Sequence, residues 1–243
     1  HQPDLDIANP TVRDEIAKIA GFWLELGVDG FRLDAVPYLF ERDDAAGAEA
    51  DLSPQDLIRW IRAFVGRRRG DALLLGEVNL PPRRLADYFG DGQGDQMHQL
   101  FDFPLMQATW LALARCDAEP MRAVLRETPA IPPDCQWATF LRNHDELTLD
   151  QLTEAEREEV FAAFAPDPDM RLFGRGIRRR VPSMFGGDEA RTRMAYSLLF
   201  ALRGTPVLFY GEEIGMGEQL DIPGRLSVRT PMQWTSERNR SEE

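Results

Sequence analysis

The stretch GFRLDAV at residues 30–36 carries an arginine and an aspartate near the end of an otherwise apolar run. Residues two apart on a β-strand point to the same face, so Arg32 and Asp34 are expected to share one face. Phe31 and Leu33 then point the other way, toward covering helices. A neighbouring guanidinium favours the charged form of a carboxyl group. The pair is therefore either a structural ion pair or an aspartate nucleophile that is held ionised.

A second carboxylate, Glu77, ends the apolar stretch LLLGE at residues 73–77. A carboxyl group placed against apolar surroundings loses hydration, which raises its pKa and suits it to act as a general acid. The alternative interpretation is a carboxylate that simply faces a loop.

The stretch FLRNHDE at residues 140–146 ends another predicted strand and carries His144 and Asp145 at its exit. His144 can hydrogen-bond sugar hydroxyls, and Asp145 can stabilise positive charge on a substrate. Metal ligation is disfavoured, because the chain has only three histidines and no metal-ligand spacing. We expect no metal at this site, and a structural cap formed by the Asn-His-Asp turn stays as the alternative.

These three carboxylates follow three separate predicted strands. Barrel enzymes collect their catalytic groups at the C-terminal ends of parallel strands. Two carboxyl groups with different roles around one bond are typical of glycoside cleavage. Four aromatic residues nearby either offer faces to sugar rings or belong to the core: Phe101, Phe103, Trp137 and Tyr210.

Helices and strands must alternate to position these groups. An N-cap residue followed by proline predicts helix starts at Asn9-Pro10 and at Ser53-Pro54. A capping box formed by Thr153 and Glu156 predicts a further start. Other helical segments are expected near 105–127 and over 188–202, and the first helix should bury one face made of Val12, Ile16, Ile19, Trp23 and Leu26.

The predicted strands cover residues 31–36, 72–78, 98–105, 137–144 and 206–211, and residues 165–187 are predicted to form a long loop. Alternating strands and helices predict parallel βαβ units. Five such units fit either an open sheet or part of a (β/α)8 barrel, and periodicity does not distinguish the two.

The composition of the chain limits the classes of molecule that it is expected to bind. A net charge of −13 and a pI near 4.8 make nucleic acid an unfavourable partner. The arginine triplets 67–69 and 178–180 are expected to be solvated or to lie at helix ends. Two cysteines without a CxxC pattern fit a reducing compartment, so a cytoplasmic location is expected, and no apolar run is long enough to span a membrane.

The motif set resembles glycoside hydrolase family 13, the α-amylase family. GFRLDAV is similar to the family's nucleophile strand, LLLGEV to its acid/base strand and FLRNHD to its third catalytic strand. QPDL at residues 2–5 resembles the end of the inserted domain B, and GTPVLFYGEEIGM at 204–216 resembles the last barrel strand.

The resemblance implies a role for each matching residue. Asp34 would be the nucleophile that forms a β-glucosyl enzyme, and Glu77 the acid that protonates the leaving oxygen and later acts as base. Asp145 would bind substrate hydroxyls and favour a distorted ring. Arg32 would orient Asp34, and His144 would hydrogen-bond the same sugar.

Within the family, the segments FLRNHDELTL, GIRRR and VRTPMQW are similar to the trehalose synthase branch, which isomerises maltose to trehalose. This predicts a retaining enzyme that acts on maltose through a covalent intermediate. One segment departs from that branch, because Glu77 is followed by Val-Asn-Leu-Pro where the branch tends to have Ala-Asn-Gln-Trp. A glucosidase that hydrolyses maltose or short α-glucans therefore remains an alternative, and a non-catalytic amylase-like scaffold is a second.

Five strands do not close an eight-stranded barrel, and the family's Asp-x-x-x-Asn-His segment has no match in this chain. The resemblance therefore predicts a partial (β/α)8 barrel that contains roughly strands 4 to 8, with residues 1–8 as the tail end of domain B and 9–243 as the C-terminal part of the catalytic barrel. Residues 1–243 alone are expected to be inactive. No cofactor is expected for the chemistry, a structural Ca²⁺ is expected at most in the full-length enzyme, and the expected partner is a disaccharide or short α-glucan.

Overall fold

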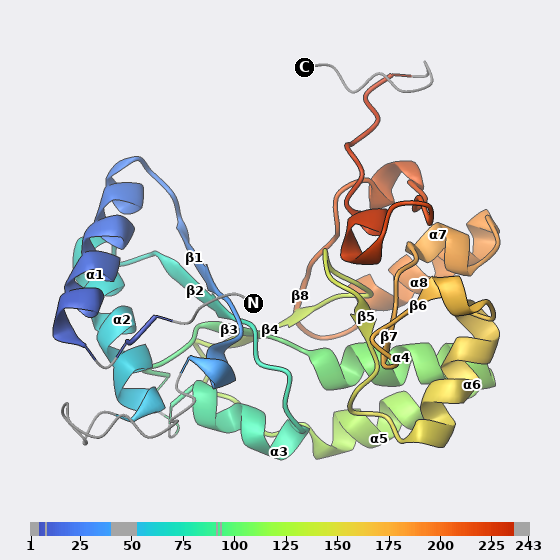
Figure 1. The fold of residues 1–243 in the computed structure, drawn as a ribbon. Coiled ribbons are helices and arrows are strands. Elements are labelled where there is room, and N and C mark those ends of the chain that lie inside the picture. The colour runs from blue at the N-terminus through green and yellow to red at the C-terminus, as the bar shows by residue number, and fades with distance from the viewer. Residues whose placement is uncertain (1–4, 8, 40–52, 91, 93, 236–243) are drawn as a thin grey trace. The chain divides into compact units, whose positions relative to one another are not determined.

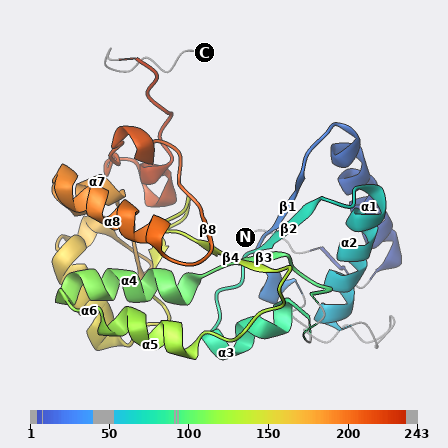
Figure 2. The same cartoon turned by 180° about the vertical axis from the view of Figure 1, so that it is seen from behind.

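A computed structural model describes residues 5–7, 9–39, 53–90, 92 and 94–235 of the chain. The residues form two compact units. The first comprises His1–Phe101 and Thr128–Trp137, and the second comprises Asp102–Glu127 and Ala138–Glu243. Figures 1 and 2 show the elements of both from opposite sides, and each unit is described by itself.

The first unit alternates helices and strands, as the sequence predicts. Its elements are helices α1 (Pro10–Glu25), α2 (Pro54–Arg68) and α3 (Pro82–Leu85), short 3-10 helices Val36–Tyr38 and Ala86–Tyr88, and strands β1 (Gly30–Leu33), β2 (Leu73–Gly76) and β3 (Gln99–Phe101).

The strands of the first unit are parallel. Arg32 on β1 is in register with Leu75 on β2, and Leu75 is in register with Gln99 on β3. The first half of β4 (Gln136–Thr139) extends this pattern, because the Gln136 N–H donates to the His98 carbonyl at 2.9 Å. The predicted parallel βαβ arrangement is confirmed.

Both predicted helix starts in this unit are confirmed. The Asn9 side chain accepts a hydrogen bond from the Thr11 N–H, with Pro10 at the first helical position. Ser53 and Asp56 cap each other reciprocally at the start of α2. Because each cap satisfies backbone donors that the first helical turn leaves unpaired, these residues fix where the helices begin.

The predicted buried face of α1 is wrong. Ile19, Trp23 and Leu26 are 53%, 47% and 62% exposed, whereas the helix buries Gly21 and Leu24. The periodicity correctly marks an apolar face. However, the strip of α1 that packs against the core of this unit, beside α2, lies next to that face rather than along it.

The second unit is built on four longer helices: α4 (Phe103–Arg115), α5 (Glu119–Glu127), α6 (Glu154–Phe164) and α8 (Glu189–Ala201). Its shorter elements are strands β5 (Leu147–Thr148), β6 (Arg171–Leu172), β7 (Gly176–Ile177) and β8 (Thr205–Pro206), helix α7 (Val181–Met184), and 3-10 helices Pro168–Met170, Glu212–Ile214 and Gly224–Val228. Helix α4 packs against both α5 and α6, as Figure 1 shows.

Strand β8 pairs in parallel with the second half of β4, where Ala138 is in register with Thr205. The prediction of one long loop over 165–187 is wrong, because β7 pairs with both β5 and β6 in a small antiparallel sheet. The predicted capping box between Thr153 and Glu156 is confirmed at the start of α6.

All five predicted strands are too long, and one predicted helix is two. The strand predicted over 31–36 ends at Leu33, where the chain turns into the 3-10 helix Val36–Tyr38, and the strand predicted over 72–78 covers only Leu73–Gly76. The strand predicted over 98–105 stops at Phe101, because Asp102 caps α4 by accepting from the Leu105 N–H. The segments 137–144 and 206–211 keep strand geometry only at their first residues. The helix predicted near 105–127 breaks at Cys116, which takes a left-handed φ of 54°.

Aromatic packing centres the core of the second unit. Trp110 is fully buried, and its ring contacts those of Phe164 and Phe185. The Trp110 indole N–H donates to the Leu141 carbonyl at 2.8 Å, which anchors the segment after β4. Within the part of the chain that the structure describes, no helix combines the length and apolarity needed to cross a bilayer.

Candidate active site

Arg32 on β1 and Asp34, in the turn directly after the strand, are both exposed. Phe31 and Leu33 pack on the core of the first unit instead. The Arg32 guanidinium lies 2.8 Å from Asp34 Oδ1 and also pairs with Glu77 Oε2. One arginine therefore bridges the two carboxylates that the sequence suggested for nucleophile and acid.

The backbone at the ends of β1 and β2 fixes this arrangement. The Glu77 N–H donates to the Leu33 carbonyl, and the Val36 N–H donates to the Glu77 carbonyl, both at 3.0 Å. Between them, Ala35 adopts a left-handed φ of 45°, which is uncommon for a residue other than glycine. Such outliers collect at functional sites, where the surrounding structure holds them.

Burial and charge give the two carboxyl groups different environments. The Asp34 side chain is 74% exposed, whereas that of Glu77 is 16% exposed. Burial raises the pKa of Glu77 to about 7, Arg32 opposes the rise, and Asp34 reinforces it through a hydrogen bond and its charge. A carboxyl group with a pKa near 7 can donate and accept a proton near neutral pH.

The second unit holds His144 and Asp145. Asp145 is half-buried, and its backbone N–H donates to the Asn143 side chain at 2.9 Å. His144 Nε2 lies 3.8 Å from Asp145 Oδ2, so the predicted pair is adjacent. Because the two units are described separately, the convergence of Asp145 with Asp34 and Glu77 stays a prediction.

Arginines that the sequence reasoning did not assign surround Asp145. Arg229 and Arg225 both reach Asp145 Oδ1, the latter at 3.2 Å. Arg225 also donates to the buried Glu146 at 2.5 Å. The buried Arg142 holds the loop from behind by donating to the Asp145 backbone carbonyl. The VRTPMQW motif was the available signal for Arg229, and no periodicity pointed to the pairing.

The second arginine triplet ends at the N-cap of α7, which agrees with the predicted helix end, but it is not a solvated face. Arg180 is fully buried and donates to the carbonyls of Val228 at 2.7 Å and Tyr210 at 2.6 Å. Arg178 and Arg179 likewise donate to backbone carbonyls of distant segments. The triplet therefore anchors the 210–228 segment, which carries Arg225 and precedes Arg229.

Most of the aromatic residues suggested for sugar stacking belong to the core. Phe101, Phe103 and Trp137 are all at most 6% exposed. Tyr210 is partly exposed, but its hydroxyl donates to the Thr230 carbonyl at 2.6 Å. Of the two interpretations, burial favours the core for the first three.

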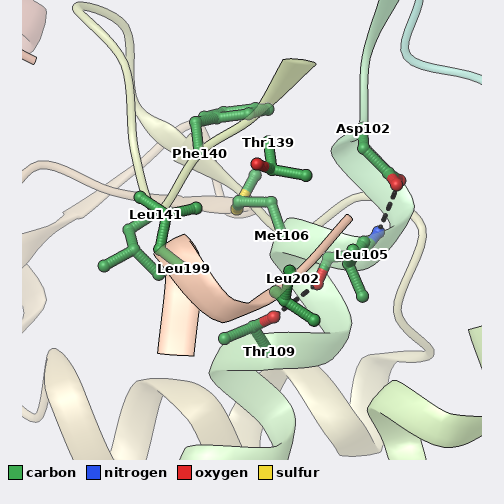
Figure 3. Close-up of a pocket in the computed structure, with 9 residues that line it drawn as sticks. All are labelled: Asp102, Leu105, Met106, Thr109, Thr139, Phe140, Leu141, Leu199 and Leu202. Carbon is green, nitrogen blue, oxygen red and sulfur yellow. Dashed lines mark hydrogen bonds between the residues drawn. The ribbon is translucent and has the colours of Figure 1, made fainter. Parts of the chain in front are cut away.

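A small cavity lies in the second unit, and its lining includes none of the three predicted catalytic carboxylates. It encloses about 10 Å³ between α4, the end of β4 and α8, and it is shown in Figure 3. Asp102 lines it with Oδ1 bonded to the Leu105 N–H, and Oδ2 is buried without a hydrogen-bond partner. Burial raises the pKa of Asp102 to about 6. The volume is that of roughly one water molecule, so the cavity is too small for a sugar.

Metal-ligand clusters and disulfides are both absent from the described residues. No group of three or more His, Cys, Asp or Glu side chains in the described ranges could hold a metal ion. Cys116 and Cys135 are both free thiols. The structural Ca²⁺ that the family resemblance implies at most for a full-length enzyme stays a prediction.

Comparison with known proteins gives independent evidence for the family to which the chain belongs. Residues 1–164 match the family profile described as "Alpha amylase, catalytic domain". The chain is 46% identical to a trehalose synthase of Thermus thermophilus and 44% identical to a trehalose synthase/amylase TreS of Mycolicibacterium smegmatis. Each alignment covers 98% of this chain but only 24% and 40% of those relatives, so the chain spans well under half of their length.

A solved α-amylase from H. orenii has the same fold. It superimposes with a TM-score of 0.67 at 27% identity, over 98% of this chain and 40% of the α-amylase chain. This match confirms the predicted fold class, an α/β chain that forms part of a (β/α)8 barrel. The bridged carboxylates at the ends of parallel strands, the profile match and the curated relatives agree: the chain belongs to the α-amylase family.

Proposed function

We propose that this chain is part of a retaining α-glucosyl-transferring enzyme that acts on maltose and isomerises it to trehalose. The observation that carries the proposal is the Arg32 bridge between Asp34 and Glu77, together with the pKa of about 7 at Glu77. The relatives named trehalose synthase support the choice of substrate and product.

In the first step, the Asp34 carboxylate attacks the anomeric carbon of the non-reducing glucose of maltose. The bond from that carbon to the glycosidic oxygen breaks, and Glu77 donates its proton to the leaving oxygen. A β-glucosyl ester on Asp34 and free glucose result. Arg32 keeps Asp34 oriented and ionised before the attack.

In the second step, Glu77 is ionised and removes the proton from the anomeric hydroxyl of the freed glucose. That oxygen attacks the same carbon, the ester bond to Asp34 breaks, and Glu77 is protonated again. Two inversions give net retention, and the product is the α,α-linked disaccharide. Because Glu77 must both give and take a proton, a pKa near 7 suits it.

Asp145 and His144 are proposed to bind hydroxyls of the same glucose. Arg225 and Arg229 hold the Asp145 carboxylate on one side, which leaves it oriented for hydrogen bonds from the sugar. Preorganised polar groups of this kind avoid reorganisation during the reaction.

We also propose the domain division expected from the sequence. Residues 1–8 would end the inserted domain B, although residues 1–4 and 8 lie outside the described ranges, and residues 9–243 would form the C-terminal part of the barrel. The substrate is a disaccharide or short α-glucan, and the chemistry needs no cofactor beyond these side chains.

Hydrolysis is the second candidate outcome. The residues after Glu77 depart from the trehalose synthase branch, as Val78 to Pro81 show. That segment would line the acceptor side, where water competes with the freed glucose.

Incubation of the full-length protein with maltose tests the proposal. Accumulation of trehalose supports isomerisation, whereas glucose alone supports the hydrolase. If neither forms, and an aryl α-glucoside is also untouched, the chain is closer to a non-catalytic scaffold. Asp34→Asn in the same protein should abolish either activity, while Asp71→Asn, at the opposite end of the strands, should not.

A further inference from the structure

Phe173 has an unusual backbone for its residue type. It lies between β6 and β7 with a φ of 55°, and Gly174 follows with a φ of 64°. The Arg175 N–H donates to the Leu172 carbonyl at 3.3 Å, which closes a tight turn with both central residues left-handed. Such turns select Asn, Asp or Gly at the first central position, so a phenylalanine there costs stability.

The side chain gains little burial in return. Phe173 is 63% exposed, so the fold of the second unit does not need its ring as core. A strained backbone that carries an exposed aromatic side chain is a pattern that favours a functional explanation.

The residues around the Phe173 ring indicate what function the exposed side chain has. The Arg225 guanidinium lies 5.5 Å from the centre of the Phe173 ring, within cation–π range. The same guanidinium lies 3.2 Å from Asp145 Oδ1. One arginine therefore places an aromatic face and a carboxylate beside each other within the second unit.

This combination matches the two sides of a sugar. A pyranose ring has an apolar face of C–H bonds and a rim of hydroxyl groups. An aromatic ring can cover the face while a carboxylate accepts from the rim. We infer that Phe173 is a substrate-contact residue, the stacking platform for a pyranose ring of the α-glucoside whose hydroxyls Asp145 binds. The inference rests on the proposed function.

Because the Phe173 backbone is strained, a substitution at this position can distinguish a role in substrate contact from a role in stability. In the full-length protein, Phe173→Gly should leave the midpoint of thermal unfolding unchanged or higher, because glycine adopts this φ without cost. At the same time it should raise KM for maltose about 5- to 10-fold, with kcat changed less than about twofold, as for the loss of uniform binding. Phe173→Tyr keeps the aromatic face and should restore KM to within about twofold.

Phe200→Ala is the matched control, because Phe200 is 60% exposed but lies on α8. It should leave KM for maltose unchanged. If Phe173→Gly has the KM of the wild type, or if Phe173→Tyr fails to rescue it, the inference is wrong while the proposed function stands. If the wild-type protein produces neither trehalose nor glucose from maltose, the proposed function fails and the inference falls with it.

Discussion

Removal of the arginine that bridges the two carboxylates gives the sharpest prediction. Arg32 contacts both Asp34 and Glu77, and its charge lowers the pKa of Glu77 against the effect of burial. In Arg32→Met the burial remains and the opposing charge is lost. The pKa of Glu77 should therefore rise above its present value of about 7.

The size of the change follows from the geometry. A contact ion pair typically shifts a carboxyl pKa by about 1 to 3 pH units. The Arg32 side chain is 32% exposed, so solvent and salt weaken the interaction and the lower end applies. We expect the pKa of Glu77 to rise by roughly one pH unit, which is about 1.4 kcal/mol.

The assay is the pH dependence of kcat/KM for maltose in the full-length protein. Because Glu77 must be protonated to donate, its pKa sets the basic limb of the profile. That limb should move to higher pH in Arg32→Met, while the maximal kcat/KM falls because Asp34 loses its orienting partner. Arg69→Met is the control, since Arg69 pairs with Asp29 and Asp71 instead. A basic limb that stays in place, or moves to lower pH, would show that Arg32 does not lower the pKa of Glu77.

Three further predictions concern stability, measured by urea unfolding of the full-length protein. Asp102 has a pKa of about 6 in the folded state against the ordinary value of 3.8, so the stability that its protonated form contributes is present below pH 3.8 and is lost as the pH rises through 6. Asp102→Asn should therefore raise the free energy of unfolding by about 3 kcal/mol at pH 8 and by less at pH 5, and an equal gain at both would contradict the burial argument. Arg180→Met leaves the carbonyls of Val228 and Tyr210 without their donor and should lower the free energy of unfolding by about 2–3 kcal/mol, with no loss at all as the opposing result. Ser53→Ala removes the capping box of α2 and should cost about 1 kcal/mol, whereas Ser53→Asp should keep most of it.

The sequence predicted local features well where a single residue decides them. Asn9, Ser53 and Thr153 each start a helix because their side chains satisfy orphan backbone donors, a local effect. Alternation on β1 correctly separated Arg32 from Phe31, because strand geometry alone fixes which face a side chain takes.

Features set by distant partners were missed. The pairing of Asp145 with Arg225 and Arg229 joins positions about 80 residues apart, and no periodicity encodes it. The burial of Arg180 was not predicted, because a run of arginines is usually solvated. In this fold the carbonyls of Val228 and Tyr210 accept its hydrogen bonds and compensate for the lost hydration. The tight turn at Phe173 was also not predicted, because phenylalanine is disfavoured in a turn with left-handed central residues.

The proposed mechanism requires that Asp34 form a covalent bond to the sugar. A 5-fluoro-α-glucosyl fluoride, which slows hydrolysis of such an ester, can be incubated with the full-length protein and the modified peptide identified by tandem mass spectrometry. We expect one added fluoroglucosyl group on Asp34, with no label in Asp34→Asn. A label on Glu77 or Asp145 instead, or an unlabelled Asp34 in a protein that turns over maltose, would contradict it.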